Sequence, residues 1–112
     1  MGTMNINRVT CIGNLPENPR FVTKDGTLMA QFTVVTNHRH ADFNGKVVDE
    51  AQFTNCFAVG SIAESLQEYA KKNDRVYVEG RLRTRRDYHT EVIVETLAVL
   101  KKKEEKDRVN RD

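Results

Sequence analysis

Apolar and polar side chains alternate along much of the first 60 residues, which is the spacing of a β-strand with one buried face. The alternation predicts three strands, over residues 6–13, 28–37 and 51–60. The second of these has a firm inward face, made of Leu28, Ala30, Phe32 and Val34. Before it, Pro16 and Pro19 predict an irregular, extended crossing, because proline fixes φ and restricts the residue that precedes it.

Turn signals separate these strands. The tetrapeptide KDGT at residues 24–27 predicts the turn that leads into the second strand. Residues 38–50 are mostly polar, and Asn44-Gly45 near their centre is the strongest short hairpin-turn signal in the chain. We therefore expect a long polar loop at 38–50, after which the chain returns as the third strand.

The spacing changes to that of a helix after residue 60. In SIAESLQEYAKKN, residues 61–73, apolar side chains recur along one helical face. Ser61 with Glu64 three positions later matches a capping box, so Ser61 is the expected N-cap. Asn73 can take the left-handed conformation that closes a helix.

Two further strands are predicted, over residues 75–85 and 89–100, joined by a short hairpin. One short helix between the third and fourth of five strands is the order of the OB-fold, a five-stranded Greek-key barrel. The alternative is a small sandwich with a stray helix. We thus expect an all-β OB-fold domain over residues 5–100. Residues 1–4 are interpreted as an expression scar or N-terminal extension, and 101–112 as a charged, disordered tail.

Length and composition fit one soluble domain. The chain has 112 residues, 38% hydrophobic and 30% charged. No apolar run could span a bilayer and no signal-peptide pattern opens the chain, so a cytoplasmic, nucleoid-associated location is expected. Cys11 and Cys56 lack metal or disulfide spacing and are predicted to be small buried hydrophobes.

Charge is informative through its position, because the net charge is only +2. Residues 75–86 contain five arginines against Glu79 alone. On a strand, Arg81, Arg83 and Arg85 would form a stripe with a spacing of about 6.6 to 6.8 Å, near that of phosphates on an extended nucleic-acid strand. A solvated outer face is the alternative reading of this stripe.

Aromatic residues give candidate platforms for bases, because every base has a π-face. The candidates are Phe43, Phe53, Tyr77 and Tyr88. Tyr88 has no evident core to enter and is expected to be exposed, whereas Phe32 and Phe57 are predicted to pack in the core.

The segment NHRH at residues 37–40 has a His-x-His pair without a third ligand, so no metal site is expected. Its imidazole rings and Arg39 could instead contact bases or phosphates. We find no catalytic triad, phosphate-binding glycine loop or paired carboxylates, and expect neither an enzyme nor a cofactor.

Three segments carry a family resemblance: INRVTCIGNLPENP, DGTLMAQFTVVTN and AVGSIAESLQEYAKKNDRVYVEGRLRTR. Over residues 5–100 the chain resembles bacterial single-stranded-DNA-binding proteins. The resemblance implies an OB-fold and sequence-independent binding of single-stranded DNA in replication, recombination or repair. It also implies a homo-oligomer, with a tetramer favoured over a dimer, and replication or repair proteins as possible partners.

The resemblance also assigns positions. Phe53 and His40 fall on stacking positions of the family, Val59 falls where the family often has an aromatic residue, and Tyr88 is the nearest substitute for a third platform beside Asp87. Together with the basic positions, the expected DNA-contacting residues are Arg8, Arg39, His40, Phe53, Arg81, Arg83, Arg85, Arg86 and Tyr88.

Two departures from the family change what we expect of DNA binding and of the origin of the chain. The hairpin between the last two strands is cut to RRDYHT, which removes a DNA-contacting arm and predicts weaker, more salt-dependent binding. The chain also stops without the family's acidic tip, which indicates a trimmed tail or a short paralogue of plasmid or phage type. The alternatives are a primosome-type interaction module that bridges replication proteins, and an accessory OB domain that binds RNA.

Overall fold

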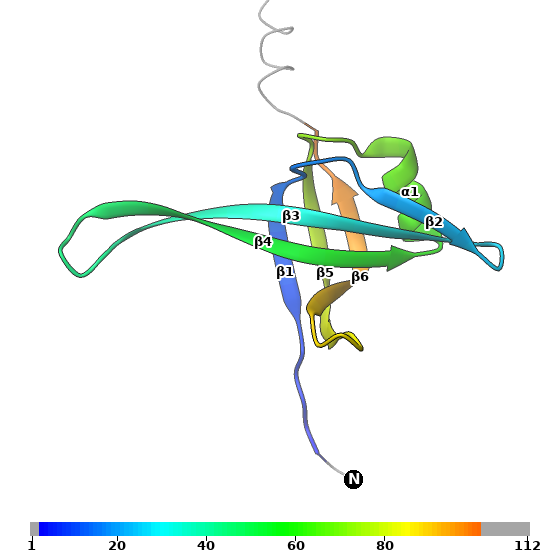
Figure 1. The fold of residues 1–112 in the computed structure, drawn as a ribbon, viewed down its shortest axis with the longest axis horizontal. Helices are drawn as coiled ribbons and strands as arrows, with labels where there is room; N and C mark the ends of the chain where they lie inside the picture. Colours follow the sequence, from blue (N-terminus) through cyan, green and yellow to red (C-terminus); the bar gives the residue numbers. More distant parts are fainter. Residues whose placement is uncertain (1–2, 102–112) are drawn as a thin grey trace, which may run out of the picture.

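The computed structural model describes residues 3–101, so the first two residues and all of the predicted 101–112 tail except residue 101 lie outside the described part. Figure 1 shows a strand-rich fold, and one helix is assigned within residues 3–101. The elements are β1 (Val9–Asn14), β2 (Arg20–Lys24), β3 (Thr27–Ala41), β4 (Val47–Val59), α1 (Ser61–Tyr69), β5 (Arg75–Thr84) and β6 (Thr90–Val99). None of the helices in residues 3–101 combines the length and apolar character needed to cross a bilayer.

The strands pair in the order β1-β5-β6-β4-β3-β2, and an additional pairing of β1 with β3 closes a ring of five strands. Most pairs are antiparallel and long, whereas β4 and β6 run parallel and pair only at Cys56↔Val92 and Phe57↔Ile93. The contact of β1 with β3 is a single pair, Asn14↔Val35. With α1 between β4 and β5, this arrangement confirms the predicted OB-fold.

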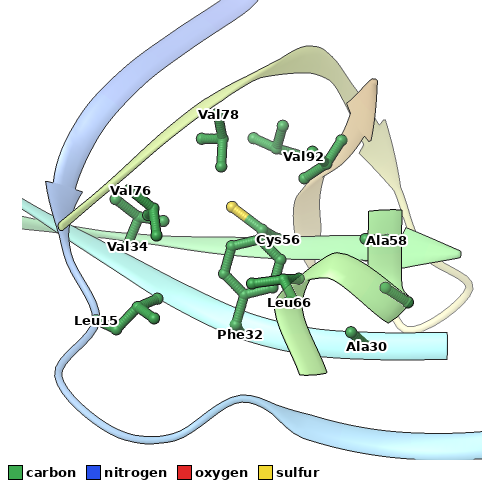
Figure 2. Close-up of a cluster of buried hydrophobic side chains, with 12 residues drawn as sticks. Leu15, Ala30, Phe32, Val34, Cys56, Ala58, Leu66, Val76, Val78 and Val92 are labelled. Atoms are coloured by element: carbon green, nitrogen blue, oxygen red, sulfur yellow. The ribbon is translucent and has the colours of Figure 1, made fainter. Parts of the chain in front are cut away.

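The core lies inside the ring (Figure 2). The predicted inward face of β3 is confirmed, because Ala30, Phe32 and Val34 are buried and Leu28 packs against them. Helix α1 adds Leu66 to the same cluster. The other buried apolar side chains are Leu15, Cys56, Ala58, Ala63, Val76, Val78, Val92 and Val94.

The prediction that the cysteines are small buried hydrophobes is confirmed for Cys56, whereas Cys11 is only half-buried where it packs against the core; both are free thiols. Burial raises the pKa of the Cys56 thiol to about 12, and Cys11 and Glu91 add to the shift.

The expected irregular crossing before residue 27 is wrong in part, because Arg20–Lys24 form β2 on the outer side of the ring. This strand pairs with β3 from Arg20↔Gln31 to Lys24↔Thr27. The predicted turn at 24–27 is confirmed, and Asp25 and Gly26 carry the positive φ angles of 54° and 79° that such a tight hairpin needs.

The expected long loop at 38–50 is also wrong. The strands β3 and β4 stay paired from Met29↔Val59 to Ala41↔Val47, and only the tip turns. In the tip, the backbone N–H groups of Asn44 and Lys46 each donate to the Asp42 carboxylate at 2.9 Å. This hairpin extends far from the ring (Figure 1), so neither face of its outer part is buried and the sequence there is polar.

The helix differs at both ends from the expectation. Gly60, with φ of 67°, is the N-cap, and no side chain makes a capping hydrogen bond, so the predicted capping box of Ser61 does not form. The N–H of Gly60 donates to the Leu28 carbonyl at 2.9 Å, which fixes the chain as it leaves β4. The helix ends at Tyr69 instead of residue 73, although Asn73 has the expected positive φ, 78°.

Candidate nucleic-acid interface

The side chains on the outer face of the β3–β4 pair are identified from those that are buried on its inner face. Phe32 is opposite Cys56 and both are buried, so the neighbouring pairs Val35↔Phe53 and Gln31↔Phe57 point outward. The prediction that Phe57 packs in the core is therefore wrong: Phe57 is half-buried on the outer face. The strand period from Phe53, four residues earlier, was the signal that could have placed it there.

Of the four candidate aromatic residues, Phe43, Phe53 and Tyr88 are exposed, whereas Tyr77 is half-buried. The Phe53 residue is 60% exposed and borders a hollow of about 240 Å³ with Leu82 and Thr90. Tyr88 is 87% exposed, as predicted, and has a positive φ of 69° in the turn between β5 and β6. Both rings are thus accessible to a flat ligand.

The arginine stripe is shorter than predicted, because β5 ends at Thr84. Arg81 and Arg83 share one face of the strand, whereas Arg85 lies at the base of the turn, where its N–H donates to the His89 carbonyl at 2.8 Å. Arg86 is in the same turn and is exposed. Within residues 3–101, Arg86 makes no ion pair.

Carboxylates balance this stripe, contrary to the expectation from the sequence. Arg81 Nε lies 3.6 Å from Glu95 Oε2, and Arg83 Nη2 donates to Glu91 Oε2 at 2.6 Å. Glu91 and Glu95 belong to β6, which pairs with β5. The balancing charges are therefore distant in sequence and become neighbours only through strand pairing.

The turn between β5 and β6 adds a further acidic group. Asp87 Oδ2 lies 3.4 Å from Arg85 Nη2, and Asp87 Oδ1 accepts a hydrogen bond from the His89 N–H at 3.1 Å. This backbone hydrogen bond, with smaller contributions from the His89 ring and Arg85, lowers the pKa of the Asp87 carboxyl. The carboxylate thus remains ionised and holds Arg85 in the turn.

Arg8 lies beside β5, ahead of the first residue of β1. Its Nη2 atom donates to Glu79 Oε2 at 3.0 Å. Asn7, the residue before Arg8, makes two side-chain hydrogen bonds to the backbone of Leu82. The N-terminal segment is thereby fixed along the same strand that carries Arg81 and Arg83.

The projecting β3–β4 hairpin carries the remaining predicted residues, on opposite faces. Arg39 pairs with Asp49 at 3.0 Å, and strand alternation puts Arg39 on the same face as Phe53. His40 lies on the other face, where its Nε2 atom is 3.2 Å from Glu50 Oε1 and its ring stacks on His38 with centroids 5.8 Å apart. The hairpin therefore does not bring His40 and Phe53 together on one face.

A pocket of about 560 Å³ joins β3, β4 and the β5–β6 turn. Phe57 forms part of its wall, and the Arg83 guanidinium carbon lies 5.5 Å from the centre of the Phe57 ring. Gln31 and Glu91, which the sequence did not single out, also line it, together with Arg85 and Arg86. In residues 3–101, no group of three or more His, Cys, Asp or Glu residues is placed to hold a metal ion.

Comparisons with known proteins agree with this geometry. Residues 6–100 match the model of the single-strand binding protein family. A single-stranded DNA-binding protein from Lactiplantibacillus plantarum is 32% identical over 112 residues, covering 92% of this chain and 55% of that protein. A single-stranded DNA-binding protein from Bacillus cereus is 36% identical over 104 residues, covering 85% of this chain and 60% of that protein. The chain thus spans less than two thirds of the length of these relatives.

The fold also matches solved structures. The structure of the Plasmodium falciparum SSB complex with ssDNA superposes with a TM-score of 0.81 at 25% sequence identity, covering 89% of this chain and 99% of that chain. A deletion mutant of the single-stranded DNA binding protein from Thermus aquaticus gives a TM-score of 0.75 at 21% identity, covering 86% of this chain and 51% of that chain. On the match of residues 6–100, this chain belongs to the single-strand binding protein family.

Proposed function

We propose that residues 5–100 bind single-stranded DNA without sequence preference and without catalytic turnover, in replication, recombination or repair. The observation that carries the proposal is the grouping of exposed aromatic rings with arginines at the end of β5 and β6. Tyr88 shares the β5–β6 turn with Arg85 and Arg86, and Phe53 borders a hollow with Leu82 and with Glu91, the ion-pair partner of Arg83. Rings for stacking and cations for phosphates are the two features that sequence-independent binding of single strands requires.

In this proposal the cations and the rings have different tasks. Arg8, Arg39, Arg81, Arg85 and Arg86 neutralise phosphates, whereas Phe53, Tyr88 and His40 stack on bases. The ion pairs of Arg81 and Arg85 are exposed on both partners, and such pairs contribute about 0 to 1 kcal/mol. Exchange of their carboxylates for DNA phosphates therefore costs little.

The same proposal covers assembly and location. We propose a homo-oligomer, with a tetramer favoured over a dimer, acting in the cytoplasm on nucleoid DNA alongside replication and repair proteins. The support is the family match over residues 6–100. Sedimentation of the full chain with and without DNA measures the number of copies directly.

The test is binding of the full chain to labelled oligo-dT, followed by fluorescence anisotropy over a range of salt concentrations. We expect affinity to fall steeply with salt, and duplex DNA to bind far more weakly. Replacing Arg81, Arg83 and Arg85 together by alanine is expected to lower the salt slope by about 1.4, because Arg81 and Arg85 are the two phosphate contacts among them and each such contact on a single strand contributes roughly 0.7.

A matched control removes three positive charges elsewhere. Lys24 is the last residue of β2, and Lys71 and Lys72 follow α1. Their replacement by alanine is expected to leave the slope within about 0.5 of the wild type. Salt-insensitive binding, or a preference for duplex, would contradict the proposal. Tighter binding to oligo-U than to oligo-dT would favour the RNA-binding alternative.

A further inference from the structure

We propose that Phe57 and Arg83 form a nucleobase pocket that takes one unpaired base of the bound strand, with Gln31 facing the edge of that base. This inference deepens the proposed function and rests on it. It gives Arg83 a different task from Arg81 and Arg85, and it adds Phe57 and Gln31 to the interface.

The first argument is the placement of Phe57. It lies on the outer face of β4, opposite Gln31, and does not belong to the apolar cluster that fills the ring of five strands. A half-buried phenylalanine on this face has one part of its ring held by the protein and another part open to the pocket. Such a fixed, partly open ring is suited to stacking on a base.

The second argument is the way in which Arg83 is held. Its partner Glu91 has a side chain that is only 6% exposed, whereas that of Arg83 is 47% exposed. Giving up the 2.6 Å hydrogen bond would leave the Glu91 carboxylate buried without its cation, which is costly. Arg83 is therefore poorly suited to exchange its carboxylate for a phosphate.

The guanidinium of Arg83 remains useful as a flat surface. Its central carbon lies 5.5 Å from the centre of the Phe57 ring, and a guanidinium plane stacks on bases as well as on aromatic rings. Held by Glu91 on one edge and next to Phe57, Arg83 forms a second wall of the pocket. A base entering there contacts an aromatic ring and a cationic plane.

The pocket also has the size and polar groups for a base. Its volume of about 560 Å³ lies within the range of small-molecule sites. The Gln31 amide offers both donors and an acceptor, so it can hydrogen-bond the edge of any base without imposing a sequence. Arg85 and Arg86 line the same pocket at the turn, where the phosphates that flank a bound base could pass.

The experiment compares Phe57→Leu with wild type on two ligands: oligo-dT, and an oligonucleotide of the same length made of abasic sites. We expect the variant to bind oligo-dT on the order of tenfold more weakly and to bind the abasic ligand as wild type does. Tyr69→Leu is the matched control, because it removes an exposed aromatic ring on α1 and is expected to change neither affinity.

A second pair of variants separates stacking from fold and charge. Phe57→Trp keeps a platform and is expected to retain binding to oligo-dT within about threefold. Arg83→Lys keeps the charge but loses the plane, so we expect a several-fold loss on oligo-dT, none on the abasic ligand, and an unchanged salt slope.

The outcomes distinguish this inference from the proposed function. Equal losses of Phe57→Leu on the two ligands, or no loss on either, would overturn the pocket while leaving single-strand binding intact. A wild-type chain that binds neither ligand would overturn both.

Discussion

The side-chain amide of Asn7 hydrogen-bonds both backbone groups of Leu82, donating to its carbonyl and accepting from its N–H, each at 2.9 Å. The register of β1 with β5 ends at Val9↔Gly80, and two residues further along each strand bring Asn7 opposite Leu82. The side chain therefore continues a strand pairing that the backbone has ended.

Replacing Asn7 by alanine is expected to cost about 1 kcal/mol of unfolding free energy, because two hydrogen bonds are lost at an exposed position. The direct measurement is hydrogen exchange at the Leu82 amide, which we expect to accelerate in the variant. Asn5→Ala serves as the control, since it removes the same side chain two positions earlier. An unchanged rate at Leu82 would contradict the role of Asn7.

Replacing Glu95 by glutamine is expected to strengthen binding to oligo-dT by about two- to fivefold. The change releases Arg81 from a carboxylate 3.6 Å away and removes a negative charge beside the phosphates. Thermal unfolding should shift little, because both partners are exposed. The control is Glu68→Gln on α1, which changes net charge equally; if both variants gain the same affinity, the effect is one of overall charge.

Replacing Ser61 by alanine is expected to change stability by no more than about 0.3 kcal/mol, whereas loss of a capping serine costs about 1 kcal/mol. The reason is that Gly60, not Ser61, is the N-cap and no side chain caps the helix. Denaturant unfolding of Ser61→Ala and of Gly60→Ala measures the two changes in stability, and Gly60→Ala is the contrast. At φ of 67° we expect Gly60→Ala to lose about 1 to 3 kcal/mol.

Alkaline pH is expected to destabilise the protein through Cys56. An unfolded cysteine titrates near about 8.5, but burial keeps the folded thiol protonated up to about 12. Below about pH 8.5 the Cys56 thiol is protonated in both the folded and the unfolded chain, and the protein keeps its full stability. Above about pH 8.5 the unfolded thiol ionises, so the free energy of unfolding falls by about 1.4 kcal/mol per pH unit. Urea unfolding between pH 8 and pH 9.5 should show a shallower decline for Cys56→Ala; identical declines would contradict this cause.

The inward face of β3 was predictable because it is buried along the ring, and burial imposes a regular apolar period on Ala30, Phe32 and Val34. The outer halves of β3 and β4 were not, because both faces of that hairpin meet water and leave no such period. For the same reason β2 could not be predicted from the sequence, because its residues are exposed except for half-buried Phe21. Strand pairing, not side-chain pattern, defines these segments.

The candidate site was predictable in its cations but not in their environment. Arg81 and Arg83 stand out in the sequence, yet Glu91 and Glu95 reach them only through the register of β5 with β6, which shifts between Glu79 and Gly80. The strand period puts Phe57 on the same face as Phe53 but does not say which face is inward, and the pairing of Phe32 with Cys56 decides that. Both errors concern relationships between strands that a local pattern does not contain.

The carboxylates beside the arginines have a consequence for which anions the protein retains. A single phosphate, such as that of a free nucleotide, displaces one carboxylate and gains little, because one ion contact is exchanged for another. A polyanion displaces several carboxylates at once, and after the first exchange each later one is intramolecular. In the proposed function, the exposed pairs Arg81–Glu95 and Arg85–Asp87 therefore favour a continuous strand, which exchanges both carboxylates, over a small anion, which exchanges one.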